Sequence, residues 1–112
     1  MNFTVSSNPT YTIIASEVDK LNASNAPELK AAILQTNKES CNHIIIDLTK
    51  TDYCDSSGLS AILSANRLCK NANGVFVLTG LQANVRKMIE IAQLHRVLNI
   101  TDTLEEAEKM MP

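Results

Sequence analysis

The sequence predicts an α/β domain in which a mostly parallel, mixed sheet of about five strands is covered by four helices. Three observations lead to this fold class. Short apolar segments typical of buried strands alternate with longer segments whose apolar residues recur at helical spacing. The resulting order is strand, strand, helix, strand, helix, strand, helix, strand, helix, and such alternation requires crossovers between parallel strands. Finally, the chain has 112 residues without an internal repeat or linker, so we expect residues 1–112 to form one domain.

The first two strands are predicted at 3–6 and 11–16, because turn-forming residues at 7–10 separate two segments of high strand propensity. These strands can form a hairpin. Apolar residues at positions 18 and 21 indicate that the second strand continues through 17–23.

The first helix is predicted to begin at Asn25. Asn25 can cap the helix, Glu28 stands three residues further on as in a capping box, and Pro27 suits the first turn. Apolar residues then recur on one helix face, and the pattern fades at 37–40.

Residues 43–48 predict a central strand, because three consecutive isoleucines indicate apolar cover on both faces of the sheet. A connection at 49–54 leads to a helical pattern over 57–70. Asparagine and glycine residues at 71–74 are suited to a left-handed C-cap that ends this helix.

The C-terminal third contains a buried strand at 75–79, a third helix outlined by apolar residues from 81 to 92, and a short strand at 97–100. Asp102 and Glu105 have the spacing of a capping box for a last helix. We expect His95 to cover the C-terminal end of the third helix, where a cation is favourable.

The composition excludes several classes of function. Hydrophobic residues make up 45% and charged residues 20%, and the formal net charge is −2. Because no basic cluster exists, we expect no nucleic-acid partner. No apolar run is long enough for membrane insertion, and the N-terminal residues lack the pattern of a secretory signal. We therefore expect a cytoplasmic protein.

Three cysteines, at positions 41, 54 and 69, are odd in number and include no C-x-x-C pair. Neither a metal site nor a redox pair is supported by this spacing. We interpret them as reduced, mostly buried thiols, and we expect no metal and no other cofactor.

Residues 55–59, Asp-Ser-Ser-Gly-Leu, stand where the second helix is predicted to begin. A helix N-terminus presents unpaired N–H groups and a partial positive charge. Ser57 can therefore either cap the helix or carry a phosphate that the helix end helps to hold. Gly58 has no side chain to block that phosphate from the backbone. Asp55 can cap the helix or orient the Ser57 hydroxyl, and Ser56 is most simply a loop or capping hydroxyl.

The element order and residues 42–63 resemble the STAS domain family, and within it the small bacterial anti-sigma factor antagonists. The matching text is Ile-Ile-Ile-Asp-Leu at 44–48, Tyr53, Asp-Ser-Ser-Gly-Leu at 55–59 and Ala-Ile-Leu at 61–63. Two further stretches, 25–29 and 103–107, are similar to the starts of the family's first and last helices.

This resemblance implies a regulatory protein with no catalytic residues of its own. The implied partner is an anti-sigma factor that is also a serine kinase. The unphosphorylated antagonist binds it, phosphorylation of Ser57 abolishes binding, and a serine phosphatase restores it. The implied surroundings of the phosphorylation site, and the implied partner interface, are Asn22, Asp55, Ser56, Gly58 and Leu59.

One departure from the family pattern keeps a second hypothesis open. The family typically reads Gly-Glu-x-Asp before its first helix, whereas the matching residues here are Asp19-Lys20-Leu21-Asn22. Asn22 removes a negative charge near the reactive hydroxyl. The alternative is a STAS scaffold or accessory subunit of a signalling or lipid-transport complex that is not phosphorylated.

A third hypothesis is an enzyme in which Ser57 is a nucleophile and His43 or His95 its base. The sequence disfavours it, because no G-x-S-x-G elbow is present.

Overall fold

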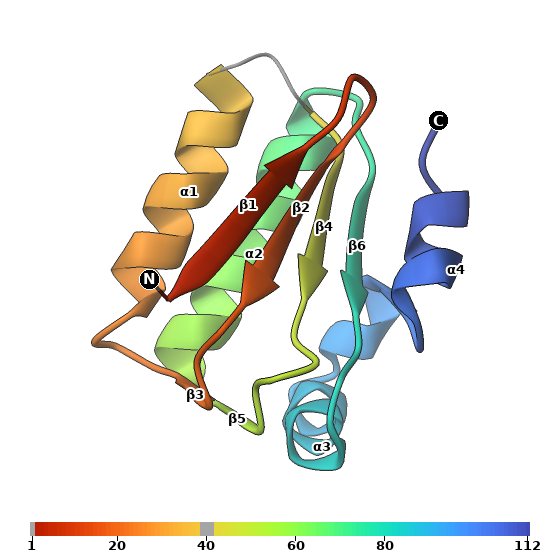
Figure 1. Cartoon of the computed structure of the whole chain (residues 1–112). Coiled ribbons are helices and arrows are strands. Elements are labelled where there is room, and N and C mark those ends of the chain that lie inside the picture. Colours follow the sequence, from red (N-terminus) through yellow and green to blue (C-terminus); the bar gives the residue numbers. More distant parts are fainter. Residues whose placement is uncertain (1, 39–41) are drawn as a thin grey trace.

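A five-stranded sheet forms the centre of the computed structural model, which describes residues 2–38 and 42–112 (Figure 1). Its strands lie in the order β1 (Phe3–Ser7), β2 (Thr12–Ser16), β4 (Ile44–Asp47), β6 (Phe76–Thr79) and β7 (Asn99–Thr101). β1 pairs antiparallel with β2, and every other neighbouring pair is parallel. The predicted α/β class, the mixed sheet and the central position of the isoleucine strand are confirmed.

The helices cover the two faces of this sheet unequally. α1 (Ala26–Lys38) and α2 (Ser56–Asn71) lie side by side on one face, and the short α4 (Leu104–Lys109) packs on the other (Figure 1). α3 (Ala83–Ile91) lies beyond the carboxyl ends of the strands, next to the 3-10 helix η1 (Leu94–Arg96).

Alternating side chains of β4 divide the core in two. Ile44 and Ile46 belong to the large core beneath α1 and α2, whereas Ile45 packs with Val77 and Ala107 beneath α4. None of the three isoleucines has exposed surface. The isoleucine run thus reflects a strand with apolar cover on both faces.

A second, two-stranded sheet differs from the sequence expectation. β3 (Lys20–Leu21) pairs in parallel with β5 (Tyr53–Cys54), where we expected a continuation of β2 and a plain connection. Leu21 and Cys54 are fully buried at matched positions of this pair. We call it the β3–β5 ribbon; it directly precedes α2, and a short loop joins it to α1.

The start of α1 also differs from expectation. Asn25 does not form a capping box with Glu28, since the Glu28 carboxylate accepts a hydrogen bond from the Asn2 amide at 2.9 Å. The Asn25 side chain instead accepts the Asn22 N–H at 2.9 Å and donates to the Lys20 carbonyl at 2.9 Å. Asn25 therefore fixes the loop between β3 and α1, and Pro27 lies in the first turn as predicted.

The predicted capping box of the last helix is wrong by one residue. Thr103 and Glu106 form it: the Thr103 hydroxyl accepts the Glu106 N–H at 3.2 Å, and the Glu106 carboxylate accepts the Thr103 N–H at 3.1 Å. Asp102 pairs instead with Arg86 of α3 at 3.1 Å. The Asp102 side chain thus does not cap α4, although its N–H donates to the Glu106 carboxylate at 3.2 Å.

His95 does not lie at the end of α3 as expected. The helix ends at Ile91 with Ala92 as its C-cap, and the exposed His95 follows in η1. The left-handed conformation of Gln93 (φ 59°) separates the two helices. The predicted left-handed end of α2, by contrast, is confirmed at Asn73 (φ 59°).

Candidate functional site

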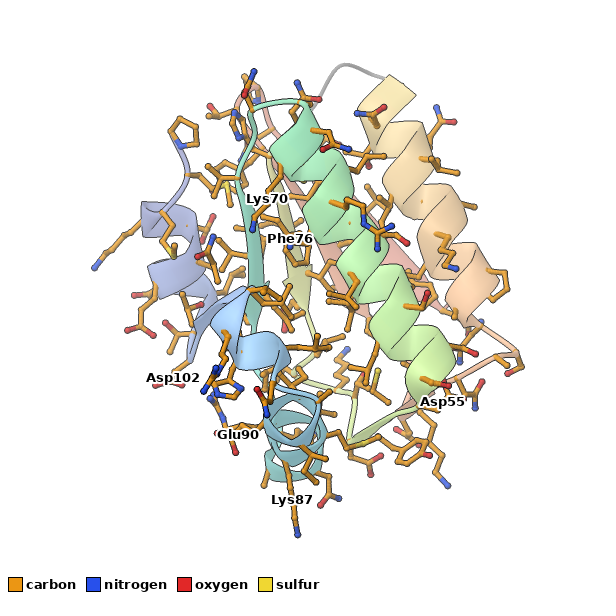
Figure 2. All side chains as sticks on the ribbon, turned by 180° about the vertical axis from the view of Figure 1, so that it is seen from behind. Asp55, Lys70, Phe76, Lys87, Glu90 and Asp102 are labelled. Carbon is orange, nitrogen blue, oxygen red and sulfur yellow. The ribbon has the colours of Figure 1, made fainter. Side chains whose placement is uncertain are left out.

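Asp55 is the N-cap of α2 and lies at the lower end of that helix in Figure 2. Its backbone is extended, with φ −90° and ψ −173°, and its Oδ1 accepts the Gly58 N–H at 3.0 Å. The Leu59 N–H then bonds to the Asp55 carbonyl at 2.9 Å, which starts the helical ladder. The helix thus begins at Ser56, one residue earlier than predicted, and a carboxylate caps it rather than a serine.

Ser57 is the second residue of α2 and is half-buried. Within residues 2–38 and 42–112, no hydrogen bond engages its hydroxyl. The N–H groups of Ser56 and Ser57 are the helix donors that the Asp55 side chain leaves open, because that side chain takes the Gly58 N–H. The capping interpretation of Ser57 is therefore wrong, and the hydroxyl remains available.

The Ser57 side chain faces a surface hollow of about 330 Å³, which we call the Ser57 hollow. It lies where the N-terminal ends of α1 and α2 come together (Figure 1). Three serines from α2 line one side of it. The other lining residues come from α1 and the loop before it: Ala23, Ala26, Pro27 and Lys30. An open recess results, with hydroxyl groups on one side, mainly apolar surface on the other and a single charged side chain.

Gly58 faces away from this hollow. A Cβ atom at this position would lie 2.6 Å from the Cys54 Sγ and 2.9 Å from the Leu21 carbonyl oxygen. The glycine therefore allows α2 to pack closely against the β3–β5 ribbon. Since its N–H is taken by Asp55, it does not expose backbone to a phosphate as the sequence suggested. Leu59 is half-buried and packs against the large core.

Asn22 lies in the loop between β3 and α1. Its side-chain oxygen accepts hydrogen bonds from the N–H and the hydroxyl of Ser24, at 3.0 and 2.6 Å. It is not among the residues that line the Ser57 hollow. Asn22 shapes the loop that places Ala23 at the hollow. Any effect of Asn22 on the surroundings of Ser57 is therefore transmitted through the conformation of that loop.

Cys54 lies behind the hollow as a neutral packing residue. Burial, and secondarily the negative charge of Asp55, raise the pKa of the Cys54 thiol to about 12. A protonated thiol is a poor nucleophile. Cys69 is buried as well, as the sequence predicts, and Cys41 lies outside the described residues.

Neither histidine lines the Ser57 hollow. The Nδ1 of His43 accepts the Val75 N–H at 3.0 Å, where β4 and β6 begin, whereas α2 starts beyond their carboxyl ends. In the part of the chain that the structure describes, no group of three or more histidine, cysteine, aspartate or glutamate side chains could hold a metal ion. In that same part, no helix has the length and apolar character needed to cross a membrane.

Comparison with known proteins identifies related sequences. The model of the STAS domain matches residues 8–107. The putative anti-sigma factor antagonist BtrV of Bordetella bronchiseptica is 26% identical over 87 residues, which are 78% of this chain and 75% of that protein. The anti-sigma-B factor antagonist of Listeria monocytogenes is 30% identical over 87 residues, covering 78% of this chain and 74% of that protein.

Solved structures share the fold. A putative anti-sigma factor antagonist from Thermotoga maritima superposes with a TM-score of 0.83 at 24% identity, covering 96% of this chain and 92% of that one. The phosphorylated form of the Bacillus cell fate determinant SpoIIAA has a TM-score of 0.74 at 20% identity, with 96% of each chain covered. Because the family model spans residues 8–107 and a relative 30% identical is an anti-sigma-B factor antagonist, the chain belongs to the STAS domain family, of the anti-sigma factor antagonist type.

Proposed function

We propose that this protein is an anti-sigma factor antagonist controlled by phosphorylation of Ser57. In the proposed cycle, the unphosphorylated protein binds an anti-sigma factor that is also a serine kinase. Phosphorylation of Ser57 releases the complex, and a serine phosphatase restores binding. The protein is the substrate of these enzymes and contributes no catalytic residue. This ATP-dependent cycle would take place in the cytoplasm.

The observation that carries the proposal is the unengaged Ser57 hydroxyl at the Ser57 hollow. A phosphoacceptor must be reached by a kinase, and the hollow opens this side chain to the surface. The neighbouring lining residues Ala23, Ala26 and Pro27 are small, so a docking protein can approach closely. Asp55 supplies the cap of α2 and thereby leaves the serine free for another role.

The proposed switch acts at the surface rather than on the fold. A phosphoserine brings about −1.5 to −2 charges and three acceptor oxygens. The Asp55 cap does not involve the Ser57 hydroxyl, so the added group need not disturb the start of α2. A bound partner would have to desolvate the new dianion. A thousandfold loss of affinity requires only ~4 kcal/mol, and an unpaired charge at an interface can cost that much.

A phosphorylation assay tests the proposal directly. Incubation with the cognate kinase and Mg-ATP should add one phosphate, located at Ser57 by tandem mass spectrometry. Ser57→Ala should abolish incorporation, and Ser56→Ala, the matched control at the neighbouring exposed serine, should retain it. Incorporation at Ser56 or Ser60, or none with any partner kinase, contradicts the proposed switch.

A binding assay separates the switch from the scaffold alternative. Ser57→Asp should weaken binding to the anti-sigma factor at least about tenfold in calorimetry, or ~1.4 kcal/mol. Asn73→Asp adds the same charge at the opposite end of α2, in a left-handed conformation that aspartate tolerates. It should bind as the wild type does. Equal affinities for all three proteins would favour a STAS scaffold or accessory subunit that is not phosphorylated.

A further inference from the structure

We propose that Lys30 is the internal counter-ion of phosphorylated Ser57. The inference deepens the proposed function and rests on it, because it concerns the phosphorylated state. Lys30 lies in the second turn of α1, and its side chain lines the Ser57 hollow opposite Ser56, Ser57 and Ser60. One positive charge therefore faces three hydroxyl-bearing side chains across a single recess.

Lys30 lies between α1 and α2 rather than projecting away from both. Besides the Ser57 hollow, it lines a smaller hollow of about 150 Å³ further along the same two helices. That second hollow is mostly apolar and is completed by Ile33, Leu34, Ser64 and Leu68. A lysine can rest its methylene stem on such apolar surface while its ammonium group stays in water. Lys30 therefore borders both hollows between α1 and α2, and the first of them is the one that Ser57 lines.

The ammonium group of Lys30 has no anionic partner in the described parts of the chain. The ion pairs there join Lys50 to Glu17 and Arg86 to Asp102. Two acidic residues are adjacent in sequence to residues that line the hollow, and both side chains accept hydrogen bonds from other donors. Glu28 of α1 accepts the Asn2 amide, and Asp55 accepts the Gly58 N–H.

The phosphate of phosphorylated Ser57 supplies the missing anion. An ammonium group has three donors and no acceptor, and a phosphate presents three acceptor oxygens. Binding between them would hold the phosphate inside the Ser57 hollow. It would also remove the cation of Lys30 from the surface that a docking protein meets. Phosphorylation then changes that surface twice: it adds an anion, and it neutralises the one charged side chain that lines the recess.

The test is a ³¹P NMR titration of the full chain with phosphoserine incorporated at position 57 during synthesis. The second pKa of phosphoserine is ordinarily about 6. Removing a cation that pairs with the dianion raises this pKa, and an exposed pair corresponds to a change of roughly 0.5. We expect this rise in Lys30→Met and in Lys30→Gln, and a wild-type value in Lys30→Arg.

Lys87→Met is the matched control. It removes the same charge from an exposed lysine of α3 that lines a different hollow, with Tyr53 and Ile91. Its titration should coincide with that of the wild type. The difference between Lys30→Met and wild type should shrink at 1 M salt, where the screening length is about 3 Å. Superimposable curves for Lys30→Met, Lys30→Gln and Lys87→Met overturn the assignment.

This outcome is independent of the kinase assay, because synthesis rather than a kinase installs the phosphate. Superimposable titrations would reject Lys30 as the counter-ion while leaving phosphorylation of Ser57 standing. Failure of the kinase to phosphorylate Ser57 would reject the proposed function, even if the titration curves of the Lys30 variants differ from that of the wild type.

Discussion

The Asp55 carboxylate accepts the Gly58 N–H at 3.0 Å, and this bond determines where α2 begins. Helix capping, one of the two roles that the sequence leaves open for Ser57, is thereby carried out by Asp55. Asp55 holds the helix end, and Ser57 carries a hydroxyl that no bond within the described segments engages.

Removal of the cap should destabilise the fold. We expect Asp55→Ala to lower the free energy of unfolding by ~1 kcal/mol, since it leaves the Gly58 N–H without its acceptor. Asp55→Asn should retain most of the stability because its amide oxygen can still accept. Ser57→Ala should change stability by less than about 0.5 kcal/mol. Urea unfolding measures all three; an equal loss in Ser57→Ala and Asp55→Ala would show that the serine takes part in the cap.

Gly58→Ala should destabilise the protein although alanine is the better helix former by about 1 kcal/mol. The added Cβ would lie 2.6 Å from the Cys54 Sγ and 2.9 Å from the Leu21 carbonyl oxygen. Overpacking of this kind costs ~1–3 kcal/mol.

A double-mutant cycle with Cys54→Ala checks the origin of that cost. The second substitution should recover part of the loss, because it removes the sulfur but not the Leu21 carbonyl. Strictly additive effects would rule out the Cys54 contact as the cause.

Cys54 should make stability depend on pH in the alkaline range. Its folded-state pKa is about 12, whereas an unfolded thiol titrates at about 8.5. The folded state therefore binds more protons between these values, so stability is complete below about pH 8.5 and falls as the pH rises towards the folded-state value. Cys54→Ala should show a shallower loss between pH 8 and about 10 in urea unfolding. Parallel pH profiles for the two proteins would contradict a protonated, buried Cys54.

The Tyr11 hydroxyl should hold α4 on the sheet. It donates a hydrogen bond to the Glu108 carboxylate, and this bond is the main cause of the raised pKa of Tyr11. Tyr11→Phe should speed amide hydrogen exchange in α4 and leave exchange in α2 unchanged. Tyr53→Phe, at an exposed residue of the β3–β5 ribbon, is the control. Unchanged exchange in α4 of Tyr11→Phe would show that its apolar contacts alone hold the helix.

Long periodic segments could be predicted from sequence, and short elements paired across the chain could not. The central strand at 43–48 and the helix at 57–70 appear as β4 and α2 because burial imposes a regular pattern on many residues. The β3–β5 ribbon has two residues in each strand, too few for any periodicity, and its partners are more than thirty residues apart. Helix boundaries also depend on contacts that local sequence does not reveal: Thr103 caps α4, whereas the Asp102 carboxylate pairs with Arg86 of α3.

The site shows the same division. A helix N-terminus at the Asp-Ser-Ser-Gly-Leu motif follows from local chemistry, and Asp55 was among the possible caps. Lys30 was missed because its place beside Ser57 depends on how α1 lies against α2, a contact between elements about thirty residues apart. The packing role of Gly58 was missed for the same reason, since Leu21 and Cys54 approach it only in the folded chain.

The β3–β5 ribbon has a consequence for mutational mapping of this protein. β3 is followed by the loop into α1, and β5 leads directly into α2. The two sides of the Ser57 hollow, one formed by α1 and its preceding loop and the other by α2, are therefore both anchored to the β3–β5 ribbon. Leu21 and Cys54 of this ribbon are fully buried, so a bound protein cannot contact their side chains. Substitutions that alter the packing of Leu21 or Cys54 would nevertheless change the distance between the two sides of the Ser57 hollow. In a mutational scan of partner binding, a loss of affinity at either position should therefore be interpreted as a change in the shape of the Ser57 hollow, not as a lost contact with the partner.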